Sequence, residues 1–200
     1  MSHSPPDVPQ DRLREEGWDR IEDTTDTLAA LPGVTVRGHT VVYGDERLRA
    51  AVADATDPPV DQPWRFFFAT RLWFEPPPPR GIGATMFASI VRSRARSGFA
   101  DRLRERGYES VERTREKTVR IATGERATLT RFTGRDLIDT GDRTRAVPVE
   151  GWVGVWHHDD FFVAGGAYPA QSLSDALELD IETDPERHRS ELFSLVRAVR

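Results

Sequence analysis

A short run of imidazole and carboxylate side chains forms the cluster of metal-type ligands in this sequence; it comprises His157, His158, Asp159 and Asp160. These groups suit zinc, nickel or copper. Adjacent strand residues point to opposite faces, so one ion could be shared only if the turn curls around it. A site would also need a further ligand, for which His39 and His188 are the candidates. We favour the alternative that this segment is a solvated hairpin turn.

A second candidate is the loop with Arg80, Gly81 and Gly83, which lies between a predicted strand and a predicted helix. Free N–H groups and the positive end of the helix dipole make such a position suitable for phosphate or carboxylate. The pattern is incomplete, because Met86 replaces the third glycine of a dinucleotide-binding loop and no Walker lysine follows. The favoured alternative is a loop whose glycines ease the chain into the helix.

The aromatic-rich residues 64–74 predict a β-strand with two different faces. One face carries Trp64, Phe66, Phe68, Thr70, Leu72 and Phe74, and the other carries Arg65, Phe67, Ala69, Arg71 and Trp73. The first face is almost wholly apolar and should pack against helices. On the second face, Arg65, Phe67, Arg71 and Trp73 could line a pocket for an aromatic or carboxylate ligand. We favour the alternative that the arginine stems cover aromatic side chains of the sheet.

Residues 86–106 give the clearest helix signal, with apolar residues at i, i+4 spacing that should cover the aromatic face. The glycine inside it, Gly98, is expected to mark close packing against a bulky strand residue. Six arginines could give the helix a basic face for nucleic acid or an acidic partner; they are Arg92, Arg94, Arg96, Arg102, Arg104 and Arg106. A solvated face neutralised by nearby acids is the favoured alternative.

Composition narrows the class of protein. The 200 residues include no cysteine, which excludes disulfides and thiolate chemistry. Acidic residues outnumber basic ones by 33 to 28, and Lys117 is the only lysine, a balance typical of salt-adapted cytoplasmic proteins. The acidic pI of about 5.6 argues against general binding to nucleic acid or anionic membranes. Because the start lacks a signal-peptide pattern and no apolar run is long enough to span a membrane, we expect a soluble cytoplasmic protein.

The remaining patterns predict an α+β fold, with a mainly antiparallel sheet of about six strands and helices 86–106 and 185–199 packed on it. Thr183 and Glu186 should form a capping box at the start of the last helix. Residues 1–10 are expected to be a disordered tail, and residues 11–200 a single domain.

Two segments are harder to assign. Residues 11–31 fit either a helix or a strand, because an apolar stripe at helical spacing is interrupted by a threonine-rich run. Residues 133–148 are polar and charged, and are expected to be a long mobile loop.

Two hairpins follow from the alternation of apolar residues. A three-residue turn, 123–125, would pair Val119 with Leu129. A four-residue loop over residues 157–160 would pair Trp156 with Phe161 and Trp152 with Gly165, so that large rings lie over glycines.

Three stretches together resemble an uncharacterised family of haloarchaeal proteins. They are residues 64–72, the segment from Gly151 through Trp156 to Pro169, and the helix end Arg104-Glu105-Arg106-Gly107-Tyr108. The resemblance implies no catalytic residue, because that family has no assigned activity. The order of elements also resembles the α/β/α sandwich of the Mog1 and PsbP type, which is similarity of architecture and carries no function.

No catalytic constellation stands out, so the leading hypothesis is a non-enzymatic domain that binds a protein partner or a small ligand, with no cofactor. One alternative is an enzyme or metal-binding protein that uses Arg65 and Arg71 or the turn His157–Asp160. A further alternative is anion or nucleic-acid binding through helix 86–106.

Overall fold

The computed structural model describes residues 4–31, 33–77, 83–141 and 143–200, which form a seven-stranded antiparallel sheet and five helices. The strands are β1 (Trp18–Leu31), β2 (Val34–Asp45), β3 (Phe66–Glu75), β4 (Glu109–Arg120), β5 (Arg126–Asp139), β6 (Thr144–His158) and β7 (Asp160–Pro169). The helices are α1 (Gln10–Glu15), α2 (Glu46–Ala55), α3 (Gly83–Glu105), α4 (Leu173–Leu177) and α5 (Pro185–Ala198). The strand order is β1-β2-β3-β7-β6-β5-β4. The predicted α+β class is confirmed, with one strand more than the approximate count expected.

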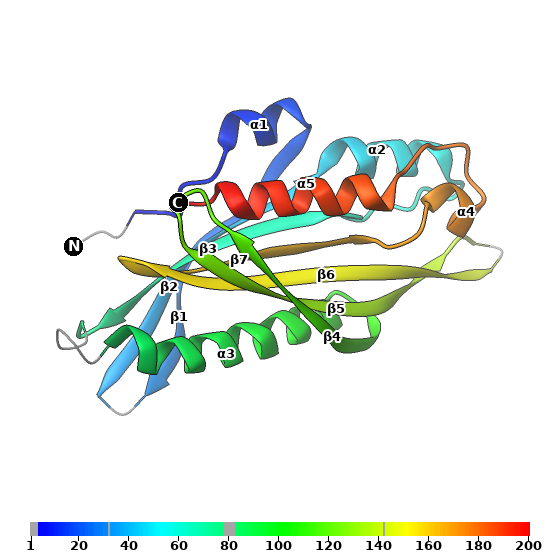
Figure 1. Cartoon of the computed structure of the whole chain (residues 1–200). Coiled ribbons are helices and arrows are strands. Elements are labelled where there is room, and N and C mark those ends of the chain that lie inside the picture. Colours follow the sequence, from blue (N-terminus) through cyan, green and yellow to red (C-terminus); the bar gives the residue numbers. More distant parts are fainter. Residues whose placement is uncertain (1–3, 32, 78–82, 142) are drawn as a thin grey trace.

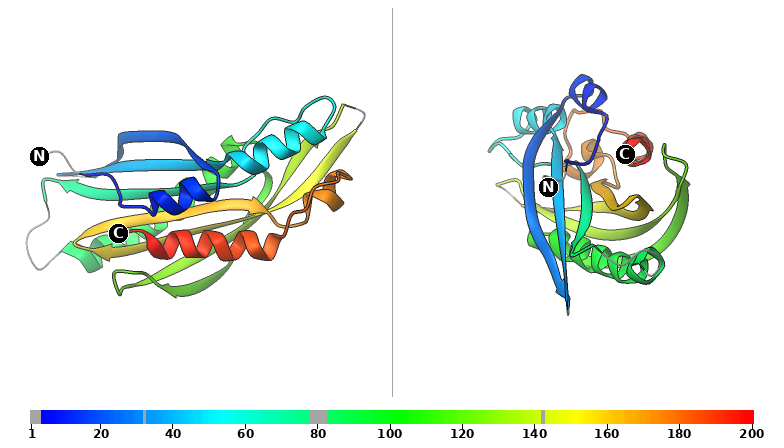
Figure 2. Two further views of the ribbon diagram at one scale, coloured as in Figure 1. Left: turned by 90° about the horizontal axis from the view of Figure 1, so that it is seen from above. Right: turned by 90° about the vertical axis from the view of Figure 1, so that its left-hand side faces the viewer.

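Helices cover both faces of the sheet (Figure 1, Figure 2). On one face, α3 contacts β6 and β4. On the opposite face, α5 lies against β7 and β3, and α1 lies beside it against β1. The shorter helices α2 and α4 contact β1 and β6, respectively. The molecule therefore has three layers, with a hydrophobic core on each side of the sheet.

Strand β3 lies between β2 and β7 and contributes to both cores. Phe74 packs against Phe87 of α3, with ring centroids 4.8 Å apart. Phe66 packs against Phe99 of the same helix. Phe67 points the other way and is fully buried in the core beneath α5. The predicted alternation along this strand is confirmed, and so is the packing of its apolar face on the long helix.

The two long helices lie close to their predicted positions, but the cap of α5 differs. The side chain of Asp184 caps α5 by accepting a hydrogen bond from the Glu186 N–H at 2.9 Å. The predicted cap, Thr183, instead accepts a hydrogen bond from the Leu173 N–H at 2.7 Å and so ties the chain to α4. Asp184 stands next to Pro185, the first residue of the helix, which places its carboxylate closer to the free N–H groups.

The predicted register of the β6–β7 hairpin is wrong by one residue. Trp156 faces Phe162 rather than Phe161, and Trp152 faces Gly166. The reason is Asp159, which adopts a left-handed conformation with φ 58°. This conformation, tolerated by aspartate, lets the strands pair up to His158 and Asp160, so no four-residue loop is needed.

The predicted register of the β4–β5 hairpin is also wrong, by two residues. Val119 pairs with Ala127 instead of Leu129. The Ile121 N–H donates to the Glu125 carbonyl at 2.9 Å, so the connecting residues are 122–124, one position earlier than the predicted 123–125. A shift of two residues keeps each side chain on its predicted face.

Two segments whose structure could not be assigned, or was expected to be irregular, contain regular secondary structure. Residues 11–31 hold both α1 and the long edge strand β1. Most of the segment expected to be a loop lies in strands: residues 133–139 belong to β5 and residues 144–148 to β6, with Asp136, Ile138 and Val147 buried.

The N-terminal segment differs from the tail expected over residues 1–10, as far as the structure describes it. The backbone of Asp7 makes two hydrogen bonds of 2.9 Å with Arg200, and Val8 is buried. The two ends of the described chain are therefore held together beside α5 (Figure 1).

Candidate functional site

A cavity of about 350 Å³ lies between α3 and the strands β1, β2 and β3. It exists because α3 packs closely over β6 and β4, whereas the helix covers the β1–β3 end of the same sheet face less tightly. The inner wall is apolar and includes Phe66, Phe68 and Leu72 of β3, together with Val42 and Val91. Such a surface suits the apolar part of a small molecule.

The cavity opens between an edge strand and the helix. Leu28 of β1 and Ile90 of α3 line the opening and remain 47% and 38% exposed, which is unusual for large apolar side chains. Gly98 of α3 also lines the cavity, and a Cβ atom added there would meet no atom within 4 Å. The expectation that Gly98 marks close packing is therefore wrong, since this glycine borders open space.

Two arginines of α3, Arg94 and Arg102, line the same cavity together with Arg106, which directly follows the helix. Arg106 lies over the ring of Phe66, at 4.2 Å from its centroid. Arg102 lies 4.0 Å from the carboxylate of Glu22 on β1, at the outer limit of an ion pair. For Arg94, no ion pair is found within the described residues. The rim thus carries positive charge that the surrounding protein only partly neutralises.

The floor of the cavity contains one polar pair. Thr40 of β2 and Thr70 of β3 face each other across the two strands, and their buried hydroxyl oxygens lie 2.9 Å apart. Each hydroxyl takes part in this hydrogen bond, so an apolar ligand can cover the pair at little cost in desolvation.

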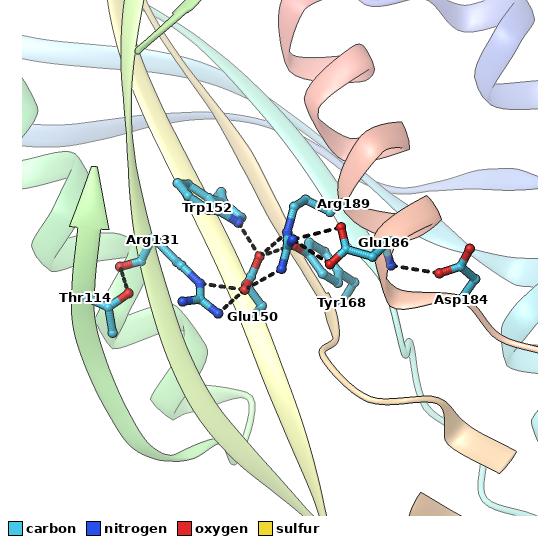
Figure 3. A network of polar contacts seen from close by, with 8 residues as sticks. All are labelled: Thr114, Arg131, Glu150, Trp152, Tyr168, Asp184, Glu186 and Arg189. Atoms are coloured by element: carbon cyan, nitrogen blue, oxygen red, sulfur yellow. Dashed lines mark hydrogen bonds and ion pairs between the residues drawn. The ribbon is translucent and has the colours of Figure 1, made fainter. Parts of the chain in front are cut away.

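A buried carboxylate network lies on the opposite face of the sheet (Figure 3). Glu150 of β6 is fully buried and accepts a hydrogen bond from Trp152 Nε1 at 2.8 Å and another from Arg189 Nε of α5 at 2.8 Å. Tyr168 OH, on the neighbouring strand, and Arg131 of β5 donate to the same carboxylate. Every side of this carboxylate is occupied by the protein, so it acts as a structural centre with no free position for a substrate.

The network controls the acidity of its members. Burial alone would raise the pKa of Glu150, but the hydrogen bonds from Arg189, Tyr168 and Trp152 and the charge of Arg131 lower it to about 2. Burial and the hydrogen bond to Glu150 raise the pKa of Tyr168. Glu150 therefore stays ionised and Tyr168 stays protonated at neutral pH.

Arg65, one of the predicted ligand-binding residues, forms a second buried network on the same face. Its guanidinium group donates to Asp45 at 2.9 Å and to Glu191 of α5 at 2.7 Å, and it stacks over the ring of Trp18. Only 6% of Arg65 is exposed. Burial raises the pKa of Asp45, whereas Arg187 and Arg65 outweigh the effect of burial at Glu191 and lower its pKa.

The other predicted ligand-binding residues on this face of β3 are not brought together around the cavity, which lies on the opposite side of the sheet. Phe67 is fully buried. Arg71 pairs with Asp160 at 2.7 Å, and Trp73 donates to Glu75 at 3.0 Å. Of the predicted anion-binding loop, Arg80 and Gly81 lie outside the described residues, and Gly83 begins α3.

The four residues of the predicted metal cluster turn to separate partners. His158 Nδ1 lies 2.8 Å from Glu125, and the ring of His157 packs edge-on against Phe161. Asp160 is held by Arg71, and Asp159 occupies the turn. In the ranges that the structure covers, no group of three or more His, Asp or Glu side chains could hold a metal ion.

Sequence reasoning missed both the cavity and Glu150. A signal for Glu150 was present: it is the lone carboxylate of the apolar run 147–156, and such a charge must find partners when the strand is buried. The only sign of the cavity in the sequence was Gly98 within α3. The volume of the cavity depends on the distance between α3 and β1, which the sequence pattern does not give.

The fold and this cavity define a three-layered α+β protein with an apolar cavity and a basic rim. The chain matches the model of a domain of unknown function (DUF6517) over residues 5–200, and it belongs to that family. No curated protein and no solved structure matches it. Within the part of the chain that the structure covers, the helices lack the combination of length and apolar character that crossing a membrane requires.

Proposed function

We propose that this protein is a single non-enzymatic domain that holds an apolar small molecule in the cavity between α3 and β1–β3. The observation that carries the proposal is the cavity, whose volume of about 350 Å³ lies within the usual range of small-ligand sites. Its wall is apolar and its opening is flanked by the exposed side chains of Leu28 and Ile90.

The residue at position 98 supports this proposal. Glycine in the interior of a helix destabilises it by about 1 kcal/mol relative to alanine. A larger residue at Gly98 would meet no neighbour within 4 Å of its Cβ, so packing does not require glycine there. Glycine at position 98 thus leaves an open space beside α3 at a cost in helix stability, and a ligand could occupy that space.

The polar side chains around the cavity favour binding over chemistry. Thr40 and Thr70 bond to each other, and Asp101 is paired with Arg104 at 2.8 Å. These groups already have partners, whereas a nucleophile would need an adjacent base.

Binding can be tested with N-phenyl-1-naphthylamine, an uncharged aromatic probe whose fluorescence rises in apolar surroundings. We expect saturable binding to the wild-type protein, and a loss of affinity of about tenfold or more in Gly98→Leu, which fills the cavity. Ser93→Leu is the matched control, because Ser93 is exposed on the same helix and does not line the cavity.

Two outcomes would contradict the proposal. One is the absence of saturable binding to the wild-type protein. The other is equal affinity in Gly98→Leu and Ser93→Leu, given that thermal unfolding shows both variants to be folded.

We also propose a salt-adapted cytoplasmic setting and a haloarchaeal source, supported by the excess of acidic residues and the single lysine. The three layers support an architectural comparison with the Mog1 and PsbP sandwich. If the setting is correct, the unfolding temperature should rise between about 0.15 M and about 2 M KCl, because salt screens repulsion among surface carboxylates. A fall over this range would contradict it.

A further inference from the structure

Two of the arginines at the cavity rim lie on either side of a glycine of α3, at equal distances along the helix. Arg94 lies four residues before Gly98 and Arg102 lies four residues after it, so all three share one face of α3. Each arginine is about 6 Å from Gly98 along the helix axis, a distance that an arginine side chain can span. The two guanidinium groups can therefore converge over the open space at Gly98.

Both groups have hydrogen-bond donors to spare. Arg94 has no ion pair within the described residues, and the contact of Arg102 with Glu22 is 4.0 Å long. The one carboxylate of α3 at the rim, Asp101, is paired with Arg104. The rim therefore has a local excess of positive charge, although the chain carries a net charge of −5.

From this arrangement we infer that the ligand is an amphipathic anion, an apolar chain or ring system that ends in a carboxylate or a phosphate monoester. Its apolar part lies against Phe66, Phe68 and Leu72, and its head group binds between Arg94 and Arg102. This inference rests on the proposed function and specifies the class of ligand.

The chemistry of guanidinium supports this assignment. Its planar fork of N–H donors matches carboxylate and phosphate oxygens, and such charge-assisted bonds are stronger than neutral ones. Arg106 contributes differently, since it lies flat over Phe66 and extends the apolar wall toward the rim. The site thus changes from apolar to basic along one direction, as an amphipathic anion requires.

The test is displacement of N-phenyl-1-naphthylamine by molecules that share one alkyl chain and differ in the head group: decanoate, decyl phosphate, decanol and decyltrimethylammonium. We expect decanoate or decyl phosphate to displace the probe at a concentration about tenfold lower than decanol, and decyltrimethylammonium to be weakest. Comparison of the two anions identifies which head group is preferred.

Variants locate the head group. The double substitution Arg94→Gln and Arg102→Gln should keep probe and decanol binding and lose the tenfold preference for anions. Arg92→Gln is the matched control, because Arg92 is exposed on the same helix and does not line the cavity.

The outcomes separate this inference from the proposed function. If the probe binds but decanol competes as well as the anions, or if the double variant keeps the preference, the inference is wrong while the apolar site stands. If the probe itself does not bind, the proposed function fails and the inference fails with it.

Discussion

Arg189 Nε of α5 donates to Glu150 Oε1 of β6 over 2.8 Å, and this contact fixes the last helix to the middle of the sheet (Figure 3). Arg189 is about one quarter exposed, whereas Glu150 is fully buried. The helix therefore adds a second counter-charge to the one that Arg131 of β5 supplies from within the sheet.

A second contact of the same kind lies nearby on α5. Glu191 pairs with Arg65, which stands just before β3, at 2.7 Å. The two ion pairs have opposite polarity. In one, α5 contributes the cation, Arg189, and in the other it contributes the anion, Glu191. Because each buried charge is fully paired only when α5 is docked, we expect these groups to determine stability rather than ligand binding.

The first prediction concerns the Glu150 carboxylate. Glu150→Gln keeps the shape of the side chain but leaves Arg131 without its anion and Arg189 with Glu186 alone, so we expect a loss of about 3 kcal/mol in the free energy of unfolding. Urea denaturation at neutral pH measures it. Glu182→Gln is the control, because Glu182 is exposed.

The pH dependence gives the same prediction a second check. The pKa of Glu150 is lowered from 4.5 to about 2, so its contribution is present above pH 4.5 and is lost as the pH falls through about 2. Glu150→Gln should therefore approach the stability of the wild-type protein at low pH. A constant difference between the two proteins down to that pH would contradict the assignment.

The second prediction compares two arginines on one face of the sheet, Arg65 just before β3 and Arg71 within it. Arg65→Met leaves buried Asp45 without its cation and leaves Glu191 with Arg187 alone, and should cost about 3 kcal/mol. Arg71→Met removes an ion pair with Asp160 in which both side chains are more than one fifth exposed, and should cost at most about 1 kcal/mol. Equal costs in denaturation experiments would show that burial does not distinguish the two sites.

The third prediction is a loss of stability in mild acid through His188. Burial, followed by the charge of Arg65, lowers the pKa of this histidine from 6.5 to about 4. The folded state therefore binds fewer protons than the unfolded state between these values, so stability is complete above about pH 6.5 and falls as the pH drops to about 4. The expected loss is about 3 kcal/mol.

A variant separates this effect from other titrations. His188→Phe keeps a ring against Tyr168 and removes the titrating group, so the loss between pH 6.5 and 4 should be smaller by this amount. Asp45 and Asp136 have pKa values raised by burial and act in the opposite direction, so the difference between the two proteins is the quantity to measure. Parallel stability curves would refute the role of His188.

The elements that the sequence predicted well are those whose faces differ sharply in polarity. The alternation along β3 and the apolar stripe of α3 each leave one arrangement that buries the aromatic rings. The family resemblance agrees with the domain of unknown function that matches the chain. Local patterns were sufficient for these features because the spacing of apolar residues along a strand or helix determines which of its faces is buried.

Register and site depended on features that a local pattern does not contain. One residue in a left-handed conformation, Asp159, moved every pair of the β6–β7 hairpin. Arg65 and Glu150 each have one partner from α5, far along the chain, so their complete networks follow only from the tertiary arrangement. The cavity likewise depends on how α3 lies across the sheet.

The last prediction contrasts two glycines. Gly98→Ala should raise the free energy of unfolding by about 1 kcal/mol, because the new methyl group enters open space and the helix gains an alanine. Gly166→Ala should lower it by about 3 kcal/mol, because its Cβ would lie 2.0 Å from the Phe66 carbonyl oxygen and force β3 and β7 apart. Thermal unfolding of both variants tests this. If Gly98→Ala destabilised the protein, α3 would pack closely at that position, and the space assigned to the ligand would not exist.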